Sequence, residues 1–429
     1  NGVGVKLNYA TALYWAEKLY EIYKSTLGEK HDKTTSALWD LLNAYFENGD
    51  AAKAIPLAER KYQITAEMYG KNDKNALHTL HWVATAYSYI GKYKKTIEIA
   101  QELYDTHLNT DGENHESTMS AAGILANAYF GLGNYSAALQ IYQKIYDYCL
   151  KKFGEENRDT LIILTWLADT FLKLGCYEKA LELSKKAYEL GVTVLGENHK
   201  TTARALHIIS TNYINLNESK NGLKFSRKAY GAYCYIYGPE HSSTLSALNN
   251  IGRAYLHMKK YKMAIEAFET MYNIQSKIYG SEHLNCVLSL NNLATAYNGL
   301  KRHKKALHYS NLATDIHCKK LGKEHPDSLT LLANNALCLL RTGNKKAALT
   351  LADEVYQKSL KLLGENHVTT INTMGVLSAA KLANRDFATA LQLSKKAYEM
   401  AKEQFGEQHY HTKRNKKHYK KAKFRNLLH

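Results

Sequence analysis

The stretch LGENHKTT at residues 195–202 returns almost unchanged as LGENHVTT at residues 363–370. Its glycine has a counterpart every 42 residues along the chain, without a single insertion. A constant period of this length is the signature of a repeat protein, in which each repeat is one supersecondary unit. The repeat glycines are Gly28, Gly70, Gly112, Gly154, Gly196, Gly238, Gly280, Gly322, Gly364 and Gly406.

Each repeat has the pattern of two amphipathic helices. In the repeat that begins at Gly154, the side chains of Leu167, Ala168 and Phe171 are spaced to share one face of a helix. A second helix follows, with Ala180 in its small-residue position. Small residues let a neighbouring helix approach closely, and an aromatic ring fills the space beside them. Neither helix can bury its apolar face alone, so we expect the repeats to stack around one continuous core.

A short turn is expected between the two helices of each repeat. Glycine often occupies it, and glycine is the residue best suited to a tight turn. The turn residues are Gly49, Gly91, Gly133, Gly175 and Gly343, with Asn217, Lys259, Lys301 and Arg385 in other repeats.

The segment SALNNIGRAY at residues 246–255 joins these features in one helix. The pattern resembles the tetratricopeptide repeat (TPR), whose usual period is about 34 residues. The longer period here is similar to the form found in kinesin light chains. The resemblance implies an all-α, right-handed superhelical solenoid of helix-turn-helix repeats, whose first helices line a concave surface. It also implies a protein or peptide partner without identifying it, because a fold alone does not determine function.

The repeat frame divides the chain into three parts. We expect residues 1–27 to hold the second helix of an incomplete repeat and residues 28–405 to form nine complete repeats. Residues 406–429 would then form a half-repeat that ends in a basic helix. That helix would place lysines at core positions, so we expect a solvated capping helix at the end of the array. The lysines at these positions are Lys416, Lys420 and Lys423.

The composition is that of a folded chain, with 45% apolar and 23% charged residues. No apolar run approaches about 20 residues, so no membrane span is expected. No basic segment followed by an apolar one opens the chain, so no signal peptide is expected. The cysteines are isolated from one another and contain no C-x-x-C, which favours free thiols and a cytoplasmic location. They are Cys149, Cys176, Cys234, Cys286, Cys318 and Cys338.

A histidine three residues after the repeat glycine could suggest metal binding or catalysis. Asp73 and Asn157 replace it in two repeats, and both are good helix N-cap residues. We therefore interpret this position as the N-cap of each first helix, with the glycine ending the previous helix in a left-handed conformation. Histidines one repeat apart are too distant to share an ion, and no catalytic motif occurs, so we predict no metal, cofactor or enzymatic activity. The histidines are His31, His115, His199, His241, His283, His325, His367 and His409.

A partner would meet the exposed positions of the first helices. In the middle and late repeats these positions are rich in asparagine, arginine and histidine. Asparagine amides can bind a peptide backbone, and the cationic groups favour acidic residues or a terminal carboxylate. The alternative is that these are ordinary solvated helix residues. The predicted partner-binding residues are Arg204, His207, Asn249, Asn250, Arg253, His257, Asn291, Asn292, Asn298, Asn334 and Arg341.

The same positions in the earlier repeats are more aromatic. Two tryptophans among them have the alternative of being packed between neighbouring repeats. The residues are Asn43, His78, His81, Trp82, Tyr89, Asn127, Trp166, Asp169 and Lys173.

Two alternatives to a peptide-binding scaffold follow from other features. The chain begins at Asn1 in the middle of a repeat, as the sensor region of a larger signalling protein with an NTPase or protease effector would. The net charge of +17, part of it in the tail from Lys413 to His429, permits nucleic-acid binding. No aromatic stacking surface accompanies that tail, so a cap is the favoured interpretation.

Overall fold

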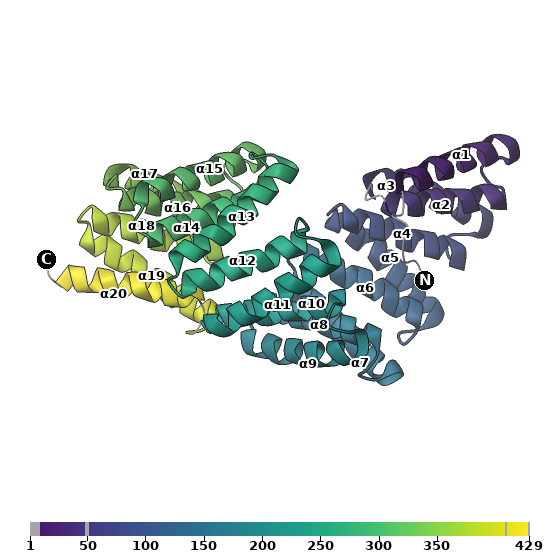
Figure 1. Ribbon diagram of the computed structural model, residues 1–429, viewed down its shortest axis with the longest axis horizontal. Helices are drawn as coiled ribbons and strands as arrows, with labels where there is room; N and C mark the ends of the chain where they lie inside the picture. Colours follow the sequence, from purple (N-terminus) through teal and green to yellow (C-terminus); the bar gives the residue numbers. More distant parts are fainter. Residues whose placement is uncertain (1–8, 48–50, 408–409, 428–429) are drawn as a thin grey trace. The chain divides into compact units, whose positions relative to one another are not determined.

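The computed structural model describes residues 9–47, 51–407 and 410–427. Within these residues the regular structure is helical and no strand occurs, which confirms the predicted all-α solenoid of consecutive helix pairs (Figure 1). In chain order the helices are α1 (Tyr9–Leu27), α2 (Asp32–Glu47), α3 (Ala51–Tyr69), α4 (Lys74–Tyr89), α5 (Tyr93–Asp111), α6 (Glu116–Leu132), α7 (Tyr135–Phe153), α8 (Arg158–Lys173), α9 (Tyr177–Leu195), α10 (Lys200–Asn215), α11 (Ser219–Tyr237), α12 (Ser242–His257), α13 (Tyr261–Tyr279), η1 (Leu284–Cys286), α14 (Val287–Gly299), α15 (His303–Leu321), α16 (Pro326–Arg341), α17 (Lys345–Leu363), α18 (Val368–Ala383), α19 (Phe387–Phe405) and α20 (Tyr410–Leu427).

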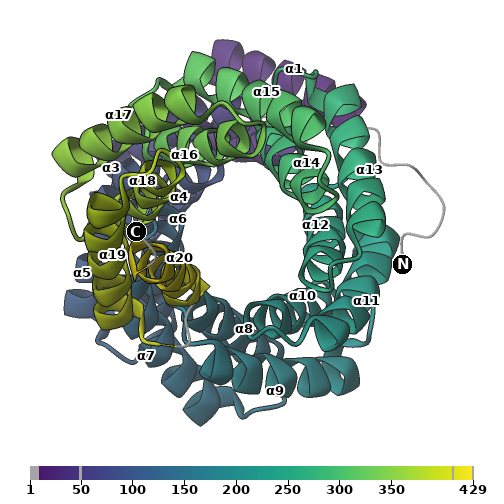
Figure 2. The same ribbon diagram turned by 90° about the vertical axis from the view of Figure 1, so that its left-hand side faces the viewer.

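The chain divides after Leu174 into two compact units. Unit 1 contains α1 to α8, and unit 2 contains α9 to α20. Within unit 2, the even-numbered helices from α10 to α20 form an inner row and the odd-numbered helices an outer row (Figure 2). The first helix of each pair therefore lines the concave side of unit 2.

Close helix packing accounts for the small residues in the repeat pattern. Gly252 on α12 is buried, and a Cβ atom built there would lie 2.4 Å from the ring of Phe268. Phe268 on α13 is itself fully buried. The ring of Phe268 on the second helix thus occupies the space that Gly252 leaves on the first helix. The sequence pattern predicted the small residue, but it placed the aromatic ring beside it on the first helix, at Tyr255, and did not identify Phe268.

The repeat glycines adopt a backbone conformation that the sequence did not predict. Gly154 has φ 81° and ψ 179°. Across the eight repeat glycines from Gly112 to Gly406, ψ lies between 150° and 179°. The prediction of a positive φ is correct, but the prediction of a left-handed helical conformation is wrong. Positive φ combined with extended ψ is essentially restricted to glycine, which explains why this position never varies along the chain.

The turn inside each helix pair has a different conformation and a looser sequence requirement. Gly133 has φ 85° and ψ 5°, the left-handed helical conformation. Residues with a side chain can adopt that region at modest cost. The described non-glycine residues with positive φ are all at this turn, namely Asn217, Lys259, Lys301 and Arg385, with φ between 60° and 68°. The predicted turn residue Gly49 lies outside the described residues.

The basic tail forms helix α20, which packs on α18 and α19 (Figure 2). Thr412 and Ala422 are buried in this contact. Lys420 and Lys423 are exposed, and the ammonium group of Lys416 lies 2.7 Å from the Glu407 carboxylate. The lysines at core positions of the repeat frame are therefore solvated or paired, as a capping helix requires.

The cysteines are free thiols, and Cys149, Cys286 and Cys338 are buried. Among the helices that the structure describes, none has the length and apolar character to cross a membrane.

Candidate functional site

The recurring histidines cap helices. In each described copy, the imidazole Nδ1 accepts a hydrogen bond from the backbone N–H two residues later, at 3.1–3.3 Å. Asp73 and Asn157 accept the equivalent bond at 2.8 Å through a side-chain oxygen. The predicted N-cap role is confirmed for these residues, because each side chain satisfies a backbone donor that the helix leaves unpaired. His409 lies outside the described residues.

Asparagine side chains link the first helices of neighbouring repeats in unit 2. The amide N–H of Asn292 on α14 donates to the Asn249 carbonyl on α12 at 2.7 Å. The same bond joins Asn334 on α16 to Asn291 on α14 at 3.2 Å. All four side chains are half-buried on the inner row of unit 2. We refer to Asn249, Asn291, Asn292 and Asn334 as the asparagine ladder.

Asn250 does not belong to this accessible set. It is 3% exposed, and its amide donates to the hydroxyls of Ser210 at 3.1 Å and Thr211 at 2.8 Å. The expectation that this position is free of packing contacts is therefore wrong for Asn250. The reason is that two hydroxyls on α10 offer acceptors at the point where the side chain reaches the neighbouring helix.

Arg253 is held beside the asparagine ladder by two amides. Its guanidinium donates to Asn250 at 3.2 Å and to Asn215 at 2.9 Å. Five N–H donors in a rigid plane suit a guanidinium to carboxylate recognition, and these bonds fix the orientation of that plane. On α16, Arg341 is exposed.

The remaining predicted residues of unit 2 have varied environments. Asn298 is half-buried, with its amide nitrogen 3.1 Å from the sulfur of Cys338 and its carbonyl 3.3 Å from a ring nitrogen of His303. His257 is exposed and borders a shallow hollow with Met258 and residues 217–221. Arg204 and His207 are half-buried on α10, and the His207 ring lies 6.3 Å from that of Tyr233. These residues do not converge on one point, so they are dispersed along the inner row.

Two further residues belong to the same surface but were missed from the sequence. Asn215 holds Arg253 in place, as described above. On α18, the carbonyl of Asn372 lies 3.0 Å from a ring nitrogen of His411 on α20. Both asparagines occupy repeat positions that the pattern assigned to the exposed face, and that signal would have identified them.

In unit 1, the two tryptophans are packing residues. Trp82 meets Trp39 of the preceding first helix edge to face, with ring centroids 5.2 Å apart. Trp166 stacks on Tyr142 at 5.8 Å and meets Phe130 edge to face at 5.3 Å. The alternative of packing between neighbouring repeats is therefore correct for both.

The other predicted residues of unit 1 lie at the surface or partly below it. Burial, assisted by nearby histidines, lowers the pKa of His81 to about 4, so this imidazole is neutral at pH 7. Asn127 is exposed and accepts a hydrogen bond from the Tyr142 hydroxyl at 2.6 Å. The exposed members of the set are His78, Tyr89 and Lys173, and the half-buried ones are Asn43 and Asp169.

Comparison with protein families identifies the repeats. A family described as "Tetratricopeptide repeat" matches residues 75–151, 159–234, 243–319 and 327–403. The starts of these matches are 84 residues apart, which is two periods of 42 residues. Among the curated proteins, none matches this sequence.

Solved structures share the fold at low sequence identity. A Rap protein complexed with competence and sporulation factor has a TM-score of 0.52 and 12% identity, covering 92% of this chain and 98% of that chain. A signal transduction ATPase with numerous domains and a TPR sensor, from Pyrococcus horikoshii, has a TM-score of 0.55 and 17% identity, covering 89% and 54%. TPR-like repeats of a putative kinesin light chain from Podosopora anserina have a TM-score of 0.40 and 23% identity, covering 48% and 97%.

Proposed function

Because the chain belongs to the tetratricopeptide repeat family, we propose that it is an interaction scaffold that binds an acidic peptide segment of a partner protein on the inner row of unit 2. The observation that carries this proposal is the asparagine ladder, which runs across α12, α14 and α16. A cytoplasmic location accompanies the proposal and is supported by the isolated, free cysteines.

The ladder offers both kinds of hydrogen-bonding group that a peptide backbone needs. Asn249 accepts through its carbonyl, which leaves its NH₂ group to donate. Asn292 donates one N–H, which leaves its carbonyl to accept. The pair formed by Asn291 and Asn334 repeats this arrangement one repeat later. An extended segment lying along the inner row can therefore exchange hydrogen bonds through its main chain, irrespective of its side chains.

Cationic residues flank the ladder and define the expected chemistry of the partner. Arg253 lies on α12, its guanidinium oriented by Asn215 and Asn250, and Arg341 lies exposed on α16. Charge-assisted hydrogen bonds to a carboxylate are about twice as strong as neutral ones. A segment that carries Asp, Glu or a terminal carboxylate near its ends is therefore preferred over a neutral segment.

Two comparisons support a binding role. The Rap protein of similar fold is complexed with a factor, and the Pyrococcus horikoshii ATPase uses its TPR region as a sensor. The similarity to the ATPase also supports the alternative that the chain is the sensor region of a larger signalling protein. A scaffold and a sensor would both bind a ligand through the repeats. Only the sensor would be coupled to an effector activity that changes when the ligand binds.

The test is selection of peptides from a randomised displayed library on purified protein, followed by affinity measurement with fluorescently labelled copies. The selected peptides are expected to be acidic. The double variant Asn249→Ala/Asn291→Ala should bind them about tenfold or more weakly, because each lost hydrogen bond contributes about 1 kcal/mol. Arg341→Glu should also weaken binding.

The matched control is Lys262→Glu, which makes the same change of sign on the exposed surface of α13 in the outer row. It should leave the affinity unchanged. Equal affinity of the wild type and the double variant would refute the proposed surface. Binding of oligonucleotides with a steep salt dependence, in the absence of selected peptides, would favour the nucleic-acid alternative.

A further inference from the structure

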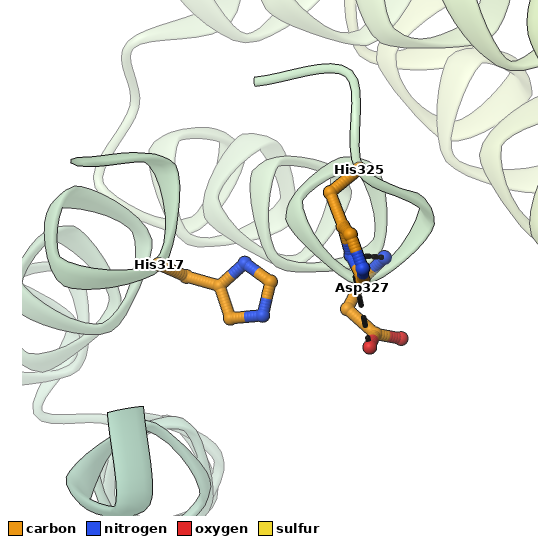
Figure 3. Close-up of side chains that lie close together, drawn as sticks. All are labelled: His317, His325 and Asp327. Atoms are coloured by element: carbon orange, nitrogen blue, oxygen red, sulfur yellow. Dashed lines mark hydrogen bonds and ion pairs between the residues drawn. The ribbon is translucent and has the colours of Figure 1, made fainter. Parts of the chain in front are cut away.

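The joint between α15 and α16 in unit 2 brings together three potential metal ligands. His317 reaches from α15 toward two side chains at the start of α16, the capping His325 and Asp327 of the first turn (Figure 3). Each of the three residues offers one ligand atom, and these three atoms all lie within 4.8 Å of one another. Among the described residues, this is the one group of three such side chains that meets this limit.

This joint departs from the repeat pattern at two of its three ligands. One repeat earlier, Gln275 occupies the position of His317 and Asn285 that of Asp327. At the position of His325, in contrast, almost every repeat has a histidine, which caps the first helix. His317 and Asp327 therefore add an imidazole and a carboxylate beside His325. Neither group is needed for His325 to cap the helix.

Hydrogen bonding fixes the tautomer of His317. The Ser328 hydroxyl donates to the Gly322 carbonyl at 2.6 Å, as Thr118 and Thr244 do to the repeat glycines of their own joints. The only hydrogen of the Ser328 hydroxyl is therefore engaged with Gly322. The Nδ1 of His317 lies 2.8 Å from the Ser328 oxygen, so Nδ1 must be protonated and donate to it. The lone pair of the neutral imidazole is then on Nε2.

A buried histidine that donates from one ring nitrogen and keeps a lone pair on the other has the arrangement typical of a metal ligand. The outer partner of such a histidine, here Ser328, orients the ring and selects the coordinating nitrogen. His317 is 7% exposed, so its position is set by the surrounding helices. His325 is half-buried and Asp327 is exposed, which leaves these two side chains room to adjust.

We propose that His317, His325 and Asp327 bind one divalent transition-metal ion of the zinc class. Two imidazoles and one carboxylate are ligands that Zn²⁺ uses, and a site with three protein ligands leaves a fourth position for water or a donor from a partner. The distance from His325 Nδ1 to the Asp327 carboxylate is 3.9 Å. Ligand atoms around tetrahedral Zn²⁺ are about 3.4 Å apart at bond lengths of about 2.1 Å. Small rotations of the His325 and Asp327 side chains would bring their ligand atoms from 3.9 Å to that distance.

Binding the ion requires His325 to change its hydrogen bonding. In the absence of metal its Nδ1 accepts from the Asp327 backbone N–H at 3.2 Å. Coordination through Nδ1 ends that bond, and coordination through Nε2 moves the ring proton to Nδ1. Either way, the cap is exchanged for a metal bond that ties α16 to α15, the second helix of the preceding repeat. The ion would therefore stabilise one specific joint of unit 2.

The test is isothermal titration of the tag-free, full chain with Zn²⁺, together with visible absorption after titration with Co²⁺. The chain contains a natural replacement for each ligand: Gln275 for His317, Asn157 for His325 and Asn285 for Asp327. The variants His317→Gln, His325→Asn and Asp327→Asn should therefore fold. Loss of an outer-shell partner alone weakens metal binding by roughly 10- to 100-fold, so loss of a ligand should weaken it by about 100-fold or more. The wild type should also give the intense visible bands of tetrahedral Co²⁺, and the variants should not.

The matched control is His283→Asn, which changes the same capping residue in the preceding repeat. It should leave the stoichiometry and affinity of the proposed site unchanged. A related set, His107, Asp111 and His115, lies at the joint between α5 and α6, where Nδ1 of His107 is 2.7 Å from the Asp111 carboxylate. The His107→Gln variant shows whether any second binding event belongs to that joint. Absence of Zn²⁺ binding in the wild type, or unchanged binding in folded His317→Gln and Asp327→Asn, would overturn the proposal.

Discussion

The two ends of helix α7 provide a direct test of why the repeat glycine never varies. Gly133 precedes the helix with φ 85° and ψ 5°, and Gly154 follows it with φ 81° and ψ 179°. At both positions a Cβ atom would have no heavy atom within 4 Å. A substitution therefore adds no clash, and its effect reports the backbone conformation alone.

The perturbation is the same substitution at each end, Gly133→Asn and Gly154→Asn. Asparagine adopts the left-handed helical region readily, so Gly133→Asn should cost less than about 1 kcal/mol. The extended conformation with positive φ is essentially restricted to glycine, so Gly154→Asn should cost about 2 kcal/mol, within a range of about 1–3 kcal/mol. A cost of about 2 kcal/mol corresponds to a roughly 30-fold larger population of the opened joint.

Hydrogen exchange measured by mass spectrometry is the suitable assay, because repeat arrays need not unfold in a single step. Amides at the junction of α7 and α8 should exchange about 30-fold faster in Gly154→Asn, when exchange is limited by the opening equilibrium. Amides at the start of α7 should change by less than about fivefold in Gly133→Asn. Equal effects at the two ends, or no effect at Gly154, would refute the conformational explanation.

Three further predictions address caps, acid stability and helix packing. His199→Asn should keep the stability of the wild type, because Asn157 caps a helix in the same way. His199→Ala should lower the local stability by about 1 kcal/mol. Hydrogen exchange at the start of α10 measures both effects. Burial, and to a lesser degree the nearby Arg and Lys charges, lowers the pKa of His418 from 6.5 to about 4. His418 is therefore protonated more readily in the unfolded chain than in the folded one. The folded state should lose stability as the pH falls from 6.5 to 4. The loss should reach up to about 2 kcal/mol at pH 5 in urea unfolding and should disappear in His418→Gln. Gly252→Ala should lose about 1–3 kcal/mol through overpacking against Phe268, and Phe268→Leu should relieve part of that loss in a double-mutant cycle.

The period and the helix caps could be predicted because they depend on local chemistry. Asp73 and Asn157 identified the capping role of the recurring histidine, and both cap helices in the structure. The ψ angle of the repeat glycine could not be predicted in the same way. Both glycine conformations have a positive φ, and the distinction depends on the direction in which the next helix leaves the joint.

Burial on the inner row depends on neighbouring repeats and so escaped the sequence pattern. Asn250 and Asn292 occupy the same repeat position, but only Asn250 is buried. The hydroxyls of Ser210 and Thr211 draw the Asn250 amide into the contact between α10 and α12. The repeat pattern assigns the same environment to both positions, so it cannot predict that only Asn250 is buried.

The three side chains at the joint between α15 and α16 could not be grouped by comparing equivalent repeat positions alone. Successive capping histidines are indeed one repeat apart. The second imidazole beside His325 comes instead from His317, eight residues earlier in the chain and at a different repeat position. The packing of α15 against the start of α16 brings the two together, and this contact is a feature of the folded joint.

Peptide binding along the inner row of unit 2 is the function proposed for this protein. Its most direct test places a photo-crosslinking amino acid at Thr295, an exposed residue one helical turn from Asn291 and Asn292 on α14. A second protein carries the same group at Glu266, which is exposed on α13 in the outer row. With a selected acidic peptide, binding along the inner row should give crosslinking from position 295 that the unlabelled peptide competes away, and none from position 266. Crosslinking from position 266 alone, or equally from both positions, would show that the peptide does not bind along the inner row.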